Sequence, residues 1–412
     1  MSIFTPLRMG AAAAAIAAAA LLPAAASAAA NPQIVRVDPT TGAAKALAGG
    51  APFTQLGGLA FGPTGRLYVA NEGPVGPAPR GAGIYSLAAP GFAVSPFATG
   101  GPTVDPAAVV ADGATLYSLD GDRVIAVDTV TGGQRVVSSG GLYDSIGVQP
   151  AFGAVSGGTL YTTASSSCSA AEGGGSYVIA VDTATGAQTL VKRFGCRALG
   201  GIATTPGGPL VVAVGGSPAK IVRLDPATGA VATMASGGSL KAPQGVALDA
   251  SGDVIVADAS SGVVAVAATG GDQSPYTAPG AVVGAVGVAV GPGGGIYVTE
   301  AGPPPTLTAT AASPQRFSRS GIAFAARPSR ASTVRYTASV RIAGRPSFAK
   351  SAAFANVQGR RALRVSLPSQ VDRRIESALR QGRAASVRLT VTPQDSRSGS
   401  LGKATTLRVR LV

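Results

Sequence analysis

The chain has 412 residues, of which 46% are hydrophobic and 13% charged, and its formal net charge is +14. It contains no histidine, which excludes Ser-His-Asp and Cys-His catalysis and histidine-ligated zinc or iron, and its two cysteines are too few for a Cys₄ site. Its 58 glycines and 30 prolines disfavour helix interiors, and the lack of tryptophan argues against a stacking platform for bases or sugars, so we expect a β-rich protein with many turns.

Residues 1–30 form a predicted secretory signal peptide. Arg8 supplies a positive charge, an Ala/Leu run extends from Met9 to Leu22, and Ala26-Ser27-Ala28 offers small residues for cleavage. A retained membrane anchor is the alternative, but the run is short and alanine is a weak lipid-facing residue. We therefore expect an exported protein, secreted or held at the cell envelope, with no membrane span after cleavage.

A D-x-x-T-G turn recurs along the next two hundred residues, each time after a short β-branched run. In such a turn the Asp carboxylate and the Thr hydroxyl accept backbone N–H groups, and Gly takes a positive φ. Two degenerate copies of the motif, which lack the Asp, follow Ile84–Leu87 and Val263–Val266. With four well-preserved copies, the motif predicts six outer hairpins. The four well-preserved turns are Asp38–Gly42, Asp128–Gly132, Asp182–Gly186 and Asp225–Gly229.

A second motif alternates with the first and is best preserved in Gly58–Ala70, Gly245–Ala257 and Gly287–Thr299. Its small and apolar residues point to both faces, which indicates strand pairs buried between neighbouring sheets. Together with three weaker copies, the motif predicts six inner strand pairs. The weaker copies end in Leu116-Tyr117-Ser118, Leu160-Tyr161-Thr162 and Leu210-Val211-Val212.

The twelve units alternate strictly, from an outer hairpin at Ile34 to an inner pair that ends at Thr299. In a ring of four-stranded blades this order is complete only if the last inner pair joins the first outer hairpin. We therefore predict an all-β fold in which residues 31–302 form a six-bladed β-propeller closed by its N-terminal strands. A linear β-solenoid is the alternative, and it would leave both ends unmatched.

The unit Pro243–Asp258 resembles an NHL repeat, and residues 31–302 as a whole are similar to the regucalcin/gluconolactonase, streptogramin-lyase and TolB-like propellers. The resemblance implies that an enzyme of this kind would bind a divalent cation on the ring axis through acidic and Asn side chains. Streptogramin-type lyases use a catalytic histidine, which this chain lacks. The shared motifs specify blades and not chemistry.

The two cysteines, Cys168 and Cys196, form a predicted disulfide, because an even pair in an oxidising compartment is most simply bonded. Cys168 follows a predicted second strand and Cys196 precedes the next first strand. Both therefore fall on the ring face that carries the links between blades, together with the long loops 71–83, 138–149 and 163–176. Loops of this composition on a rigid scaffold are typical of binding surfaces.

Polar side chains gather in the sequence where second strands end on that same face. Carboxylate and amide oxygens suit Ca²⁺, so a calcium site at the channel mouth is one hypothesis. The alternative, which the sequence favours, is that each side chain caps the following turn by accepting backbone N–H groups. The candidates are Asn71, Glu72, Asp120, Asp122, Asp258 and Glu300 as metal ligands, with Asp105 and Asp144 on the same face.

A Pro-rich linker is predicted for residues 303–315, and the charge changes sign there. Residues 1–302 carry 13 basic and 16 acidic side chains, whereas residues 303–412 carry 20 basic and 3 acidic ones. In residues 316–412, apolar residues alternate with Arg, Ser and Thr, as in Val334–Ile342 and Leu407–Leu411. We predict a small basic β-sandwich, similar to the immunoglobulin-like modules of secreted bacterial proteins.

One short helix is predicted within this module. Ser369 and Asp372 make a capping box, Val371, Ile375 and Leu379 line one face, and Gly382 ends the helix. The Arg-rich strand faces suit anionic envelope polymers, although a merely solvated outer face is the simpler interpretation. Nucleic acid is not an expected partner of an exported chain.

Three functions are consistent with these features. The leading hypothesis is a secreted or cell-surface binding or scaffold protein, whose propeller face recognises an extracellular ligand or protein and whose basic module is a spacer or envelope tether. The rival is a divalent-metal-dependent lactonase-like hydrolase of the regucalcin/gluconolactonase type. The third is a structural envelope component. The sequence favours a protein that is not an enzyme.

Overall fold

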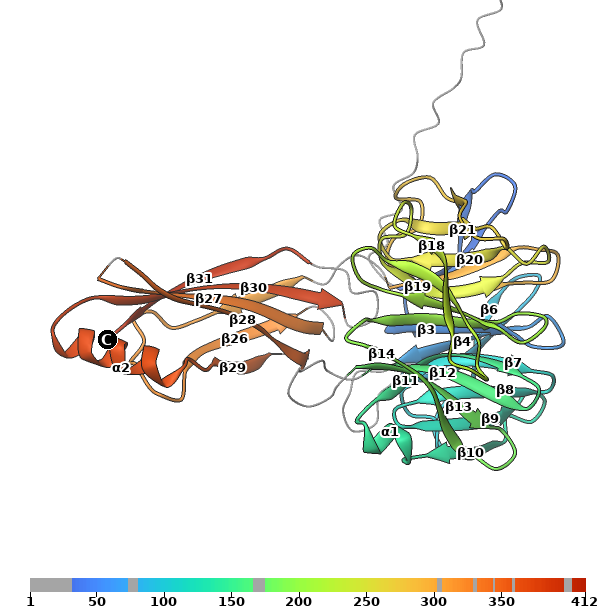
Figure 1. Ribbon diagram of the computed structural model, residues 1–412, viewed down its shortest axis with the longest axis horizontal. Coiled ribbons are helices and arrows are strands. Elements are labelled where there is room, and N and C mark those ends of the chain that lie inside the picture. The colour runs from blue at the N-terminus through green and yellow to red at the C-terminus, as the bar shows by residue number, and fades with distance from the viewer. Residues whose placement is uncertain are drawn as a thin grey trace, which may run out of the picture.

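The computed structural model describes residues 32–72, 81–165, 175–301, 306–328, 332–343, 345–357, 360–395 and 402–412. In these residues, six four-stranded antiparallel sheets form the ring at the right of Figure 1, and two further sheets follow at the left. The predicted signal peptide, residues 1–30, lies outside the described residues, as does Cys168. Within the described residues, no helix is both long and apolar enough to cross a membrane.

Each of the six sheets is a blade. The blades are numbered in the chain order of their innermost strands, and the strands of each blade are named from the innermost to the outermost. Blades 1 to 3 are β3 (Gln55–Phe61), β4 (Leu67–Glu72), β5 (Gly83–Ala88), β6 (Ala93–Ala98); β7 (Pro106–Asp112), β8 (Thr115–Asp120), β9 (Arg123–Asp128), β10 (Gln134–Ser139); and β11 (Gln149–Ser156), β12 (Thr159–Ser165), β13 (Ser176–Asp182), β14 (Gln188–Gly195). Blades 4 to 6 are β15 (Leu199–Thr204), β16 (Leu210–Val214), β17 (Lys220–Leu224), β18 (Val231–Ser236); β19 (Pro243–Leu248), β20 (Val254–Asp258), β21 (Gly262–Val266), β22 (Gln273–Pro275); and β23 (Ala285–Val290), β24 (Ile296–Glu300), β1 (Gln33–Val37), β2 (Ala44–Gly49). A short helix, α1 (Leu142–Ser145), lies in the link between blades 2 and 3.

The ring is closed by its own first strand. β1 pairs with β24 in antiparallel register, from Gln33 opposite Glu300 to Val37 opposite Ile296. Each innermost strand also contacts the innermost strands of both neighbouring blades, and β23 contacts β3. The predicted six-bladed propeller with N-terminal closure is therefore confirmed, and the linear solenoid is excluded.

The D-x-x-T-G turns form as predicted. The N–H groups of Thr40 and Thr41 both donate to Asp38 Oδ1 at 2.9 Å, and the N–H of Ala43 donates to Thr41 Oγ1 at 3.3 Å. The backbone hydrogen bond from Thr41 is the main reason that the pKa of Asp38 lies below its usual value. Gly42 has φ of +69°, and a Cβ there would meet the Tyr276 carbonyl oxygen at 2.0 Å, so only glycine fits.

The second strands are buried on both faces, as their composition predicts. In β20 and β24 every residue is buried, including the polar residues Asp258 and Glu300 at their ends. Apolar side chains such as Ile255 and Val298 fill the space between neighbouring blades. These strands are therefore rigid supports for whatever lies at their ends.

The C-terminal residues form two sheets over one core. One sheet has the order β25 (Leu307–Thr310), β26 (Ile322–Pro328), β29 (Arg361–Val365); the other has the order β28 (Arg345–Val357), β27 (Ser332–Ile342), β30 (Ala385–Asp395), β31 (Thr405–Leu411). Phe324 from the first sheet, Val340 and Leu389 from the second and Ile375 from α2 (Ser369–Arg380) share a hydrophobic core. The predicted β-sandwich with one helix is confirmed, whereas its similarity to immunoglobulin-like modules stays a prediction.

Two local predictions in this module are wrong. Leu307–Thr310 pairs with β26, from Leu307 opposite Pro328, so part of the predicted linker 303–315 is a strand. With four residues, this strand is too short for its alternation of apolar and polar side chains to predict it from the sequence. The capping box is wrong because Pro368 is the N-cap and Ser369 already lies inside the helix, where its side chain makes no capping hydrogen bond. Gly382 does end the helix, with φ of +69°.

Candidate functional site

Four polar side chains occupy one register position at the ends of second strands, on the face of the inter-blade links. They are at most 1% exposed. Blades 3 and 4 carry apolar residues at the corresponding position, as their pairing registers show. We call these four the cap residues. They are Asn71, Asp120, Asp258 and Glu300, and the apolar equivalents are Ala164 and Val214.

Asp258 shows what these side chains do. Its Oδ2 accepts the N–H groups of Lys241 and Ala242, both at 2.8 Å, from the link that precedes the innermost strand of its blade. Its Oδ1 accepts the N–H groups of Ser260 and Ser261 at 3.0 and 2.9 Å, in the turn that follows. One carboxylate therefore fastens two loops to the end of β20 through four backbone donors.

Asp120 and Asn71 cap the same kind of link in blades 2 and 1. Asp120 Oδ2 accepts the N–H groups of Val104 and Asp105 at 2.8 and 3.0 Å. Asn71 Oδ1 accepts the N–H groups of Thr54 and Gln55 at 2.9 and 3.2 Å. Burial raises the pKa of Asp120, although the two backbone donors act against this shift.

Glu300 adds a link to the ring closure. Its Oε1 accepts the N–H of Val283 at 2.8 Å, and the Gln33 side-chain amide donates to its Oε2 at 2.5 Å. Gln33 belongs to β1, the first strand of the described residues, so this contact joins residues 267 positions apart. Burial is the main cause that raises the pKa of Glu300 above its usual value.

The remaining acidic candidates do not extend this group into a cluster. Asp122 is about half exposed and lies 3.7 Å from Arg123 Nε, and Glu72 is partly exposed at the end of β4. Asp144 is exposed within α1, and Asp105 contributes its backbone N–H to Asp120. Among the described residues, no three His, Cys, Asp or Glu side chains lie close enough together to hold a metal ion.

The ring axis is lined by glycine and apolar side chains from all six innermost strands, around a cavity of about 60 Å³. The strands approach so closely that a Cβ on Gly201 would lie 2.4 Å from the Val246 backbone nitrogen, and one on Gly57 would lie 1.9 Å from the Ala107 carbonyl oxygen. Two residues from each innermost strand line the cavity, and among these described residues none is polar. The described residues that line this cavity therefore offer no side-chain oxygen as a ligand.

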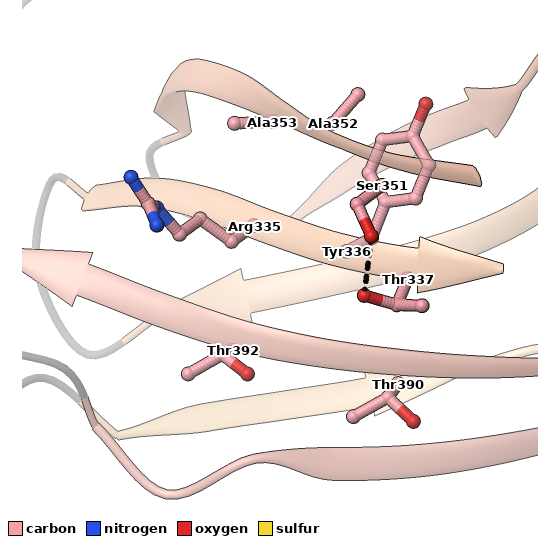
Figure 2. Close-up of a pocket in the computed structure, with 8 residues that line it drawn as sticks. All are labelled: Arg335, Tyr336, Thr337, Ser351, Ala352, Ala353, Thr390 and Thr392. Carbon is pink, nitrogen blue, oxygen red and sulfur yellow. Dashed lines mark hydrogen bonds between the residues drawn. The ribbon is translucent and has the colours of Figure 1, made fainter.

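A second polar surface lies on the outer face of the sheet β28-β27-β30-β31. The pairing register aligns hydroxyl side chains across all four strands, with Thr337 opposite both Ser351 and Thr390, and Thr390 opposite Thr406. The hydroxyls of Thr337 and Ser351 share a hydrogen bond, drawn as a dashed line in Figure 2. Their oxygens lie 2.9 Å apart, and those of Thr390 and Thr406 lie 3.4 Å apart. We call these four residues the hydroxyl row.

A hollow of about 440 Å³ is lined by three members of this row, Thr337, Ser351 and Thr390. Arg335 and Thr392 also line it (Figure 2). The sequence predicts the alternation of each strand separately, and the buried Val334, Val340, Val387 and Val409 confirm it. The alignment of the row, however, depends on the register between strands, which the sequence of each strand does not specify. The spacing of hydroxyls within each strand is the only signal that the sequence carries.

The predicted disulfide stays a prediction. Cys196 is exposed just before β15, on the predicted face, while Cys168 lies outside the described residues. The long loops 71–83 and 163–176 are also described only in part.

The chain is similar to several solved propeller structures. They include a calcium-binding regucalcin from Agrobacterium tumefaciens, at 17% identity over 63% of this chain and 82% of that one, with a TM-score of 0.44. A luciferin-regenerating enzyme matches at 10% identity over 65% of this chain and 95% of that one, with a TM-score of 0.45. TolB from Acinetobacter baumannii matches at 16% identity over 64% and 61%, with a TM-score of 0.44.

No protein-family model and no curated protein matches the chain. The expected resemblance to regucalcin-like and TolB-like propellers is confirmed by the solved structures, and it concerns the fold alone. The architecture itself rests on the strand pairing described above.

Proposed function

We propose that the chain is a secreted or cell-surface binding protein. The propeller is a rigid platform whose loop face recognises an extracellular ligand, and the basic C-terminal sandwich tethers the protein to anionic envelope polymers. The composition of residues 1–30 supports export, and the 20 basic side chains against 3 acidic ones in residues 303–412 support the tether.

The observation that carries the proposal is that the cap residues accept hydrogen bonds from the backbone N–H groups of the loops. Both carboxylate oxygens of Asp258 already accept two backbone N–H groups each, and the axis beside them is lined by glycine and apolar side chains. A resident calcium ion needs 6–8 oxygen ligands turned toward one point. Neither Asp258 nor the described residues that line the axis cavity supply such a set, which favours binding at a rigid loop face over the rival metal-dependent lactonase.

A calcium titration combined with a lactone hydrolysis assay separates the two functions. We expect no binding heat with Ca²⁺ and no hydrolysis of gluconolactone above the uncatalysed rate, for the full chain and for Asp258→Ala alike. Tight calcium binding that Asp120→Ala or Asp258→Ala abolishes, together with lactone hydrolysis, would establish the lactonase instead.

Photo-crosslinking tests recognition at the loop face. A photoreactive residue at exposed Asp144, in α1, should capture a partner in secreting cells, whereas the same residue at Val130, in an exposed turn of the opposite face, should not. Equal capture at both positions, or at neither, would contradict a recognition role for the loop face.

Sedimentation with purified cell envelopes tests the tether. The bound fraction should fall steeply as NaCl rises, because the Debye length shrinks from about 10 Å at 0.1 M to about 3 Å at 1 M. A bound fraction that does not change with salt, or no binding even at low salt, would show that the basic module is no electrostatic tether.

A further inference from the structure

The basic side chains of the C-terminal module are not evenly spread over the outer face of β28-β27-β30-β31. Arg388 and Arg408 stand directly opposite each other on neighbouring strands, and Arg410 follows two residues along β31 on the same face. Arg341 lies one row away, opposite Ser386. All four arginines are exposed, and we call them the arginine cluster.

Within the described residues, the salt bridges include no counterion for this arrangement. Like charges directly opposite each other on a strand pair are destabilising, and in the described part of the chain no member of the cluster has an ion pair. Elsewhere in the module the protein does pair such groups, since Arg319 meets Glu376 at 2.8 Å. The cluster is therefore an open anion site, which a bound anion would stabilise.

The hydroxyl row lies directly beside the cluster. Thr390 is two residues from Arg388 on β30, and Thr406 is two residues from Arg408 on β31, so hydroxyls and guanidinium groups share one continuous face. Each hydroxyl has one proton and two acceptor lone pairs, so the two hydrogen bonds within the row leave capacity for a ligand. The hollow of about 440 Å³ gives the ligand room over Thr337, Ser351 and Thr390.

The chemistry of this face defines the ligand. A guanidinium group forms paired hydrogen bonds with a phosphate, and a row of hydroxyls suits an alcohol-rich backbone. Among the described residues that point outward from β27, β30 and β31, the types are Arg, Ser, Thr and Gln, so no aromatic ring is available for a sugar or a base to stack on. We propose that the arginine cluster and hydroxyl row bind a polyol-phosphate polymer of the poly(glycerol phosphate) type.

This inference rests on the proposed tether and names its binding face. The test compares two full-length variants with equal loss of charge, R388Q/R408Q/R410Q on the cluster and R373Q/R374Q/R383Q on and after α2, where all three arginines are exposed. The probe is a synthetic glycerol-phosphate oligomer at low salt, with inorganic polyphosphate and duplex DNA as comparison ligands. A third variant, T337V/T390V, removes two hydroxyls and keeps their shape.

The cluster variant should lose at least about tenfold in affinity for the oligomer, whereas the α2 variant should lose less than about threefold. The melting temperature of the cluster variant should not fall, because its substitutions relieve the repulsion between like charges. T337V/T390V should weaken binding of the oligomer and leave polyphosphate binding unchanged.

Equal losses in both arginine variants would overturn the inference while leaving a general electrostatic tether intact. Duplex DNA that binds as tightly as the oligomer would overturn the ligand class. Failure of the unmodified chain to bind envelopes at low salt would instead remove the tether itself, so the two failures are distinguishable.

Discussion

Asp258→Ala should destabilise the propeller far more than the loss of an exposed aspartate. Asp258 is 0% exposed and accepts four backbone N–H groups from two separate loops. A hydrogen bond to a charged group contributes about 1.5–3 kcal/mol, and a buried donor left without a partner costs about 1–3 kcal/mol. Since the loops can rehydrate in part, we expect a total loss of about 3–5 kcal/mol.

At roughly 2 °C per kcal/mol for a domain of this size, the melting temperature should fall by about 6–10 °C. The matched control is Asp225→Ala, because Asp225 is exposed and accepts only two backbone N–H groups, from Ala227 and Thr228. Its melting temperature should fall by no more than about 2 °C. Circular dichroism, with and without Ca²⁺, measures both variants.

An equal fall in the two variants would show that the four hydrogen bonds of Asp258 contribute little. A melting temperature that calcium raises in the unmodified chain, but not in Asp258→Ala, would refute the reasoning altogether. The carboxylate would then be a metal ligand, because a ligand stabilises only the state that binds it.

Three further predictions concern the ring and its turns. Gly201→Ala should lower the free energy of unfolding by about 1–3 kcal/mol, because the new Cβ would lie 2.4 Å from the Val246 nitrogen. Gly91→Ala is the control and should leave the melting temperature unchanged, because a Cβ there would meet nothing within 4 Å. Equal melting temperatures in the two variants would contradict the close packing of the axis. Backbone hydrogen bonding, first from Thr185, lowers the folded-state pKa of the Asp182 carboxyl below its unfolded value of 3.8. The turn therefore stabilises the fold above that pH, and this stabilisation is lost as the pH falls through the folded pKa. Asp182→Ala removes it. The gap in melting temperature from the unmodified chain should therefore be largest near pH 6 and close below about pH 3.8, and a constant gap would disprove it. Val35→Pro should remove a ladder hydrogen bond from β1, which is paired on both sides. The hairpin β1-β2 should then become sensitive to limited proteolysis. Unchanged resistance of the variant to the protease would argue against the role of β1 in ring closure.

The architecture of the ring could be predicted because it depends on order and spacing alone. The alternation of outer and inner units leaves one arrangement in which Ile34–Val37 and Ile296–Thr299 both have partners, and the observed pairing is that arrangement. Turn chemistry is equally local, since Asp38, Thr41 and Gly42 carry all of its requirements within five residues.

The candidate site could be predicted only in part. Asp258 would stand at the end of its strand whether it held calcium or capped a loop, and the positions of the Lys241 and Ser260 N–H groups decide between these roles. Those positions depend on the three-dimensional course of two loops. The hydroxyl row was missed for a similar reason, because the alignment of Thr337 with Thr390 arises from a register that no single strand specifies.

The closure of the ring also determines when folding can finish. Gln33 finds its partner Glu300 only after a further 267 residues have been made, and until then β1 has an exposed edge where β24 will pair. Contacts so distant in sequence form slowly. The hairpin β1-β2 therefore completes its sheet only when the last blade of the ring is present, so the contact that closes the ring requires every residue up to Glu300.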